Sequence, residues 1–324
     1  MNLYDRVLSK RTRWVAPLLA PLGASLTGAD PQTVRGARQA QMHALQALQE
    51  RFSPDIVFPL MDLSVEPQIA REVISADFLN SGVPPGEVMR WLEKLEDVVD
   101  IDPEEYPAML FQLELASEMS ESFEVPVAAF ASGPFHLASQ LFGTDEMLLW
   151  AVSDEDCSIG IMEFITRLLG NYVGALAERV DLVMLVEPEL SLLSPAFFGK
   201  VCHLFFQGIA SIIRGAGASP ALQLCGDSRH MLEHLISLGM ECVSFDSPVD
   251  LRLAAETLPL NLIVMGNLDA RRLELSSPAD VRDKVRRLLR DMSGYRNFVL
   301  STGGEVSSRT PLENIEAFFE AGRA

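Results

Sequence analysis

Short apolar runs that alternate with longer segments of helical periodicity are the feature that most constrains the fold of this chain. Seven such runs lie between residues 55 and 300, and most are continuously apolar, as expected for parallel strands buried on both faces. They are residues 55–59, 125–130, 182–186, 221–224, 242–245, 262–265 and 298–300. An unbroken alternation of this kind favours a closed (β/α)8 barrel over an open dinucleotide-binding sheet.

The barrel needs one more strand, and Trp14-Val-Ala-Pro-Leu-Leu19 is the best candidate for it. Residues 31–53 are then expected to form a helix before the second strand. No linker rich in proline or serine divides the chain. We therefore expect one α/β domain over residues 1–324, in which residues 1–53 supply the N-terminal strand and a helical segment.

Three of the expected helices share one starting device, a hydroxyl residue followed by proline. The pairs are Ser194-Pro195, Ser277-Pro278 and Thr310-Pro311. The hydroxyl group can accept a hydrogen bond from a free N–H of the first turn, and proline suits the first helical position. The device predicts that a helix begins at each pair.

Composition excludes some classes of function. The 324 residues include 45 acidic and 26 basic ones, a net charge of −19, which argues against a general nucleic-acid or anionic-membrane binder. We see no signal peptide and no uncharged apolar stretch long enough for a membrane helix. The four cysteines do not form a disulfide framework, so we expect a cytoplasmic protein with Cys157 and Cys202 buried.

Two glycine-containing turns follow strands in the C-terminal half. They are Gln223-Leu-Cys225-Gly226 and Ser301-Thr-Gly-Gly-Glu305. Barrel enzymes build their active sites at the C-terminal ends of the strands, so both turns predict site residues. By the same argument Glu187 and Asp246 are expected to point into the opening, whereas Glu189 is expected to be a solvated loop charge.

Several motifs, in order along nearly the whole chain, resemble the uroporphyrinogen decarboxylase superfamily. They are DIVFPLMDLSVE at 55–66, SGPFHLASQLFG at 132–143, LSPAF at 193–197, Cys225-Gly226, MGNLD at 265–269, and STG at 301–303 with TPLENI at 310–315. The family fold is a (β/α)8 barrel, in agreement with the alternation of strands and helices. The family has two main branches, and the resemblance implies an activity of one or the other.

In the decarboxylase branch, an arginine-rich N-terminal motif grips the carboxylates of the substrate, and an aspartate near the second strand contacts its pyrrole nitrogens. Asp62 falls in the corresponding stretch. Arg11-Thr-Arg13 and the residues after it lack the paired arginines of that motif. A chain of net charge −19 without this clamp is a poor host for a polycarboxylate.

The other branch contains methyltransferases that work with corrinoid proteins and hold zinc through His-x-Cys and Thr-Gly-Cys motifs. Here Gln223 stands where the histidine is expected, Cys225 is retained, and Gly304 replaces the second cysteine. An amide oxygen and one thiolate are a weak zinc pair. A bound zinc would need a substitute oxygen ligand beside Cys225, and the candidates are Glu187, Asp246 and Glu305.

The resemblance implies a methyltransferase that moves a methyl group to or from cobalamin carried by a separate corrinoid protein. A methoxy compound, a methylamine or a folate fits the altered ligands better than a zinc-activated thiol. The residues expected to act in catalysis are Asp62, Glu187, Gln223, Cys225 and Asp246; those expected to contact the cofactor are Asn267, Gly303 and Gly304. A decarboxylase and a non-catalytic barrel that docks a corrinoid protein remain alternatives.

Overall fold

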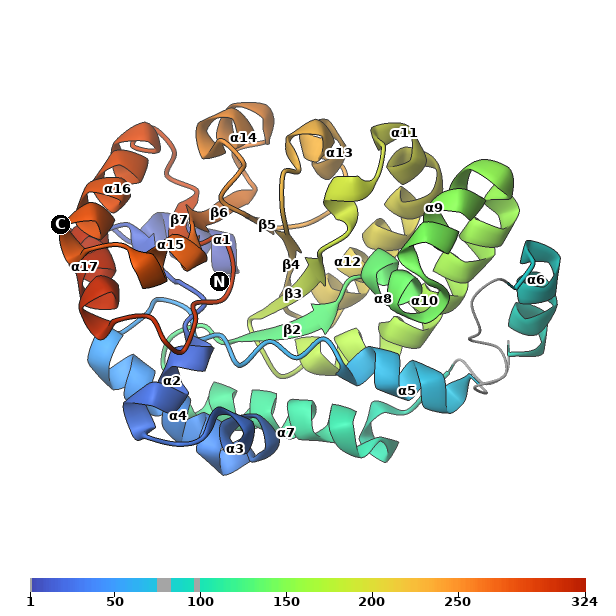
Figure 1. Ribbon diagram of the computed structural model, residues 1–324, viewed down its shortest axis with the longest axis horizontal. Coiled ribbons are helices and arrows are strands. Elements are labelled where there is room, and N and C mark those ends of the chain that lie inside the picture. The colour runs from blue at the N-terminus through green and yellow to red at the C-terminus, as the bar shows by residue number, and fades with distance from the viewer. Residues whose placement is uncertain (1, 75–82, 96–99) are drawn as a thin grey trace.

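The computed structural model describes residues 2–74, 83–95 and 100–324, and a parallel sheet of seven strands forms its centre (Figure 1). The strands stand in the order β1-β7-β6-β5-β4-β3-β2. Their bounds are β1 Trp14–Val15, β2 Ala128–Ser132, β3 Leu182–Glu187, β4 Ser219–Leu224, β5 Cys242–Phe245, β6 Ile263–Leu268 and β7 Phe298–Thr302. Six of the seven apolar runs coincide with β2 to β7 to within a few residues, whereas residues 55–59 form only an isolated bridge.

A short segment after residue 54 closes the sheet into a barrel. The N–H of Asp55 donates to the carbonyl oxygen of Val15 in β1 (2.9 Å), and Val57 forms a parallel bridge with Val127, just before β2. The segment lies between two prolines, which have no N–H to donate, so the pairing stays this short. The expected (β/α)8 barrel is confirmed, although its first strand, expected over residues 14–19, covers only Trp14–Val15.

Side chains along each strand alternate between the barrel interior and the surrounding helices. In β3, Met184 and Val186 belong to the interior cluster, whereas Val183 and Leu185 pack against the helices. Other members of the interior cluster are Trp14, Ile56, Phe58, Ala128, Phe130, Ala221, Cys242, Ile263, Met265 and Val299. The same alternation turns Gln223, two residues after Ala221, toward the interior.

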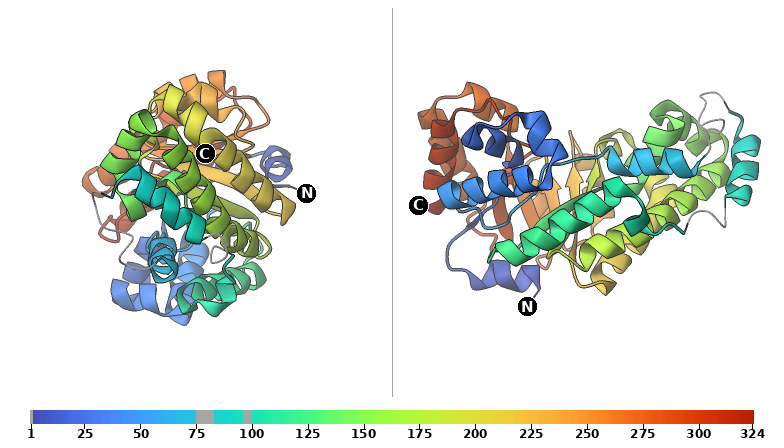
Figure 2. Two further views of the ribbon diagram at one scale, coloured as in Figure 1. Left: turned by 90° about the vertical axis from the view of Figure 1, so that its right-hand side faces the viewer. Right: turned by 90° about the horizontal axis from the view of Figure 1, so that it is seen from below.

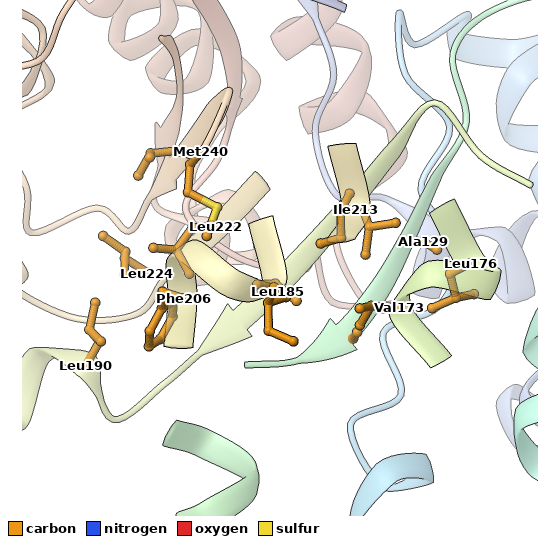
Figure 3. Close-up of a cluster of buried hydrophobic side chains, with 14 of the residues drawn as sticks. Ala129, Val173, Leu176, Leu185, Leu190, Phe206, Ile213, Leu222, Leu224 and Met240 are labelled. Atoms are coloured by element: carbon orange, nitrogen blue, oxygen red, sulfur yellow. The ribbon is translucent and has the colours of Figure 1, made fainter. Parts of the chain in front are cut away.

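The outer layer consists of helices that cover the strands. Figure 3 shows Leu185 and Leu222 of the sheet with Phe206 and Ile213, which belong to helix α12. Phe206 and Ile213 are fully buried. Burial of a side chain of this size stabilises the fold by roughly 1.5–3 kcal/mol, so this layer holds the helices on the barrel.

The α-helices in the first half of the chain are α1 Leu3–Ser9, α2 Ala20–Thr27, α3 Pro31–Gly36, α4 Arg38–Phe52, α5 Val65–Val73, α6 Pro85–Lys94, α7 Pro107–Ser122, α8 Pro134–Phe142, α9 Thr144–Ser153 and α10 Glu155–Ala177. Those in the second half are α11 Pro195–Phe197, α12 His203–Gly215, α13 Leu232–Leu235, α14 Leu251–Thr257, α15 Ala270–Leu275, α16 Pro278–Asp291 and α17 Leu312–Arg323. Short 3-10 turns η2 Pro103–Glu105, η3 Leu190–Leu192 and η5 Arg229–Met231, and the π-turn η4 Phe198–Cys202, complete the set. Helix α6 lies at the end of the molecule opposite both termini (Figure 2).

Two of the three helix starts are confirmed. The hydroxyl of Ser194 accepts the N–H of Phe197 (3.2 Å), and Ser277 forms a reciprocal capping box with Asp280. The third prediction was wrong, because α17 begins one residue later, with Pro311 as its N-cap and without a side-chain cap. The expected helix over residues 31–53 is also divided in two, since Ala37 adopts an extended conformation between α3 and α4.

One segment, Pro195–Gly215, is long and apolar enough to cross a membrane by length and composition, contrary to the expectation from the sequence. Its apolar residues Phe206, Ile209, Ala210 and Ile213 are buried in the outer layer of the barrel. Packing in this fold accounts for part of the segment's hydropathy, since 44% of its apolar window is buried.

Candidate functional site

The ends of the parallel strands bring the predicted site residues to one opening of the barrel, called the mouth below. Gln223 is in register with Val186 of β3 and Ser244 of β5, and Asn267 with Ser301 of β7. At this end, Asp62 follows the closing segment, Glu187 ends β3, Cys225 follows β4, Asp246 follows β5, Asn267 lies in β6, and Gly303 and Gly304 follow β7. This is the end where barrel enzymes place their chemistry.

Gln223 joins the two glycine-containing turns across the barrel. Its side-chain amide Nε2 donates to the carbonyl oxygens of Leu224 and Gly303, both at 3.3 Å. Its Oε1 atom is buried and has no hydrogen-bond partner among the described residues. A buried acceptor left without a donor is costly, so Gln223 presents an acceptor to a donor group or a water molecule in the mouth.

Cys225 stands two residues further on and is partly buried. Burial raises the pKa of its thiol to about 11, and the nearby carboxylates of Asp246, Glu189 and Glu187 act in the same direction. Reactive and metal-bound thiols need the opposite, a positive environment that favours the thiolate. In this structure Cys225 is therefore a neutral thiol at physiological pH.

Asp246 organises the loops beside Cys225. Its carboxylate accepts hydrogen bonds from the N–H of Gly226 (2.9 Å) and from the N–H of Ser247, the next residue in the chain (2.6 Å). Asn267 donates from its amide to the carbonyl oxygens of Asp246 (3.1 Å) and Val249 (2.6 Å). These bonds tie the ends of β4, β5 and β6 together and occupy the amide nitrogen of Asn267.

Gly303 and Gly304 differ in the space around them. A Cβ atom on Gly303 would lie 2.8 Å from Asp246 Oδ1 and from the N–H nitrogen of Ser247, so glycine is needed there for packing. A Cβ atom on Gly304 would have no atom of the described chain within 4 Å. The absence of a side chain at Gly304 is therefore not imposed by its neighbours.

Glu187 lies behind the strand rather than in the open mouth. It is fully buried, and its two oxygens accept the N–H groups of Phe135 (2.9 Å) and His136 (3.0 Å) at the start of α8. Burial, followed by the charge of Glu189, raises its pKa well above the ordinary value. Because Val186 faces the interior, the next residue must face the helices, and the expectation that Glu187 points into the mouth is corrected accordingly.

Glu189 was expected to be a solvated loop charge, and this expectation was wrong. Its side chain is 12% exposed, and one carboxylate oxygen lies 2.8 Å from Nδ1 of His136, whose side chain is 8% exposed. A hydrogen bond between a carboxylate and an imidazole fixes the orientation of the ring. Glu189 and His136 thus form a mostly buried pair beside the ends of β2 and β3.

Glu305 supplies a titratable group on the opposite side of the mouth. Its Oε1 accepts the N–H of Met61 (3.0 Å), in the loop that contains Asp62. Burial raises the pKa of Glu305 to about 7, against the opposing effects of the Met61 N–H and of Arg35. A carboxyl group with a pKa near neutrality can give or take a proton. The sequence suggested Glu305 only as a metal ligand and did not reveal this property.

Asp62 is held at the edge of the mouth by local contacts. Its Oδ1 accepts from the N–H (3.1 Å) and the hydroxyl (2.6 Å) of Ser64, and Arg35 lies 3.7 Å from its other oxygen. Glu66, in the first turn of α5, is buried and accepts two hydrogen bonds from Ser132 at the end of β2. Burial raises the pKa of Glu66. Sequence reasoning missed this residue, although it lies in the motif that carries Asp62.

The two arginines of the N-terminal stretch lie at the other end of the barrel. Arg13 donates to the carbonyl oxygens of Tyr295 (2.6 Å), Phe298 (3.1 Å) and Met292 (3.3 Å), around the start of β7. Arg11 lines a small hollow with Arg13 at the same place. Neither guanidinium group is available to a substrate in the mouth.

The donor set at the mouth does not fit zinc. Within residues 2–74, 83–95 and 100–324, no group of three or more His, Cys, Asp or Glu side chains is arranged to hold a metal ion. Where the family's zinc ligands are expected, this chain has an amide, a thiol with a raised pKa, and no side chain at Gly304. Of the three expected positions, Cys225 alone carries a side chain of the kind that binds zinc tightly.

The sequence profile of the uroporphyrinogen decarboxylase family matches residues 31–324. The chain belongs to this family. A uroporphyrinogen decarboxylase of Prochlorococcus marinus is 25% identical over 284 residues, which is 84% of this chain and 79% of the relative. The methylcobamide:CoM methyltransferase MtbA of Methanosarcina acetivorans is 25% identical over 217 residues, 65% of this chain and 62% of the relative. The matched relatives are enzymes, both decarboxylases and methyltransferases.

A solved structure described as a methyltransferase from Methanosarcina mazei has the same fold. It superposes with a TM-score of 0.82 at 18% sequence identity and covers 99% of this chain and 96% of its own. At this identity the likeness concerns the fold, and the activity of this family member has to be argued from its own residues.

Proposed function

We propose that this protein is a methyltransferase that moves a methyl group between a small molecule and cobalamin held by a separate corrinoid protein. The observation that carries this proposal is the charge of the mouth. The carboxyl groups of Asp62, Glu189, Asp246 and Glu305 lie around it with one arginine, Arg35, which approaches Asp62 at 3.7 Å, so acidic groups predominate. Arg11 and Arg13 lie at the opposite end of the barrel. A polycarboxylate would meet like charge in the mouth, which disfavours decarboxylation of uroporphyrinogen and favours a neutral or cationic group at the reacting centre.

The mouth residues suit methyl transfer from an oxygen or nitrogen atom. Cobalamin, on its own protein, supplies the cobalt centre that accepts or gives the methyl group. A methoxy or methylamine donor that loses its methyl group needs a proton on the remaining oxygen or nitrogen. Glu305, with a pKa of about 7, is suited to provide that proton. Oε1 of Gln223, which has no partner among the described residues, is suited to accept a hydrogen bond from an N–H or O–H group of the small molecule and so to orient it.

The roles of the remaining residues follow from their contacts. Asp246 and Asn267 hold the loops around Cys225. Glu187 positions α8 by accepting hydrogen bonds from the N–H groups of Phe135 and His136. Cys225 contributes an uncharged polar wall to the mouth. The proposed reaction therefore uses this chain for binding, orientation and proton transfer, in a cytoplasmic setting, without a resident zinc ion.

The proposal is tested with the purified chain and a purified corrinoid protein whose cobalt is reduced to the Co(I) state. Methylation of the cobalt changes the visible spectrum of the corrinoid, so methylamines, methoxy compounds and methylated folates are screened as methyl donors for that change. Glu305→Gln should slow the change strongly, and Arg290→Gln, on the outer surface, should leave it intact. Formation of coproporphyrinogen from uroporphyrinogen would contradict the proposal, and tight corrinoid-protein binding without any spectral change would assign the chain a docking role instead.

A further inference from the structure

A basic region stands out on this acidic protein. Of the chain's 26 basic and 45 acidic residues, eight basic and only four acidic ones lie within residues 270–296, the stretch of α15 and α16. The rest of the chain is correspondingly more acidic. A local positive field against such a background attracts anions to one place.

Part of this region forms a pocket of about 580 Å³ at the C-terminal end of β6. Arg272 of α15 and Lys284 and Arg287 of α16 line it. The volume falls within the usual range for small-molecule sites. The pocket is thus large enough for an organic molecule of moderate size and larger than an inorganic ion needs.

The charged groups differ in how firmly they are placed. Nζ of Lys284 lies 3.0 Å from the hydroxyl of Ser276, which also lines the pocket, so the ammonium group is fixed toward it. Arg272 pairs with Asp269 at 3.2 Å, and Arg287 approaches Asp291 only at 3.9 Å. Three cations and one carboxylate, Asp269, therefore line the pocket, which leaves net positive charge for a ligand.

The inner wall of the pocket is apolar. The partly buried Leu268 and the exposed Pro248 present apolar surface to the pocket, and the buried side chains of Leu273 and Val281 lie beneath it. A small inorganic anion would gain nothing from these side chains. An organic anion with an apolar or aromatic body would bury that body against them and place its charge between Lys284 and the arginines.

The pocket adjoins the mouth. Ser247 and Asn267 line it, and Ser247 directly follows Asp246, whose carboxylate accepts the N–H of Gly226 beside Cys225. The amide of Asn267 donates to the carbonyl oxygen of Asp246. A molecule seated in the pocket is therefore one loop away from the proposed reacting centre.

We infer that this pocket binds the anionic end of an amphipathic small molecule, one that bears a phosphate or carboxylate group on an apolar body. The pocket's chemistry defines this ligand class independently of catalysis. Its assignment to the methyl donor or acceptor rests on the proposed function. The acidic mouth would then receive the uncharged reacting end of the molecule, while the basic pocket holds the charged end.

The binding test measures the affinity of four probes for the full chain by isothermal titration calorimetry at low ionic strength. 1-Naphthyl phosphate carries both an anionic group and an apolar body. Inorganic phosphate carries the charge alone, and 1-naphthol the apolar body alone. The anion of 1-naphthylacetic acid carries a carboxylate in place of the phosphate. We expect the two naphthyl anions to bind more tightly than phosphate and naphthol by about tenfold or more. Equal binding of naphthol and naphthyl phosphate, or no binding of either anion, would overturn the inference.

Matched variants separate the pocket from the general field of α16. Lys284→Gln and Arg287→Gln should each weaken naphthyl phosphate binding by about tenfold, since each removes a charge that lines the pocket. Arg286→Gln and Arg290→Gln remove the same charge from the same helix outside the pocket and should change binding by about twofold or less. Equal losses in both pairs would show attraction to the helix surface and contradict a built site. Lys284→Arg keeps the positive charge and should retain most of the binding. Retained binding in this variant shows that the loss in Lys284→Gln comes from the missing charge and not from misfolding.

The same variants distinguish this inference from the proposed function. If naphthyl anions bind as expected and the corrinoid spectrum never changes, the pocket stands and methyl transfer fails. If methyl transfer occurs and Lys284→Gln alters neither anion binding nor the KM of the small molecule, the pocket assignment fails and the activity stands.

Discussion

The side-chain amide of Gln223, at the end of β4, donates a hydrogen bond to the carbonyl oxygen of Gly303, after β7, across 3.3 Å. This contact joins the two turns that hold the zinc ligands in the methyltransferase branch that the sequence resembles. Gln223 takes the place of the histidine, and Gly304, next to Gly303, the place of the second cysteine. The frame of a zinc site is thus present with two of its three donors exchanged.

Restoring the missing donors should restore zinc binding. A Cβ atom at Gly304 meets no described atom within 4 Å, so there is room to begin a cysteine side chain there, and histidine at position 223 replaces a side chain of similar size. We expect the Gln223→His and Gly304→Cys double variant to retain one zinc per chain by elemental analysis, since histidine and two thiolates form a tight set. The wild-type chain should hold substoichiometric zinc, and one tightly held zinc in the wild type would contradict our account of the mouth.

The thiol of Cys225 should react slowly with alkylating agents. Burial and nearby carboxylates raise its pKa from 9.0 to about 11, which leaves about 100-fold less thiolate at neutral pH than an unperturbed cysteine has. Iodoacetamide labelling followed by mass spectrometry should show a rate that still increases above pH 9. Asp246→Asn removes one of the charges responsible and should speed labelling, whereas Asp227→Asn should not. Rapid labelling of the wild type at pH 7 would refute the prediction.

The sequence predicted the barrel well because continuous apolar runs leave little choice of structure. It predicted the length of β1 poorly, because Pro17 interrupts the run that was taken as a strand over residues 14–19. The site was harder to predict. The direction of Glu187 depends on which residues of β3 face inward, and a run that is apolar on both faces does not reveal this. The partner of Glu189 is His136, 53 residues earlier, and no local spacing indicates such a pair.

Glu305 should make stability depend on pH. Its pKa is raised from 4.5 to about 7, so the folded state favours the protonated form; its contribution is full below pH 4.5 and is lost as the pH rises through 7. At 1.36 kcal/mol per pKa unit, the loss is about 3 kcal/mol. Glu305→Gln stays neutral, so its stability relative to wild type should increase between pH 5 and pH 8 in urea unfolding. A difference that does not change with pH would argue against the raised pKa.

Two glycine-to-alanine changes at the mouth should have very different effects. At Gly133, a Cβ atom would lie 2.1 Å from Oε1 of Glu187, the buried carboxylate that accepts the first N–H groups of α8. At Gly304, the same atom would enter open space among the described residues. Neither glycine has a positive φ angle, so the comparison isolates packing from backbone strain.

We therefore expect Gly133→Ala to lower the free energy of unfolding by about 1–3 kcal/mol, because Glu187 must move away from α8 or the strand must shift. Gly304→Ala should change it by about 0.5 kcal/mol or less. Urea titrations followed by circular dichroism give both values under one condition. If Gly133→Ala proved as mild as Gly304→Ala, the carboxylate of Glu187 would not be fixed at the start of α8, and its position behind the strand would have to be reconsidered.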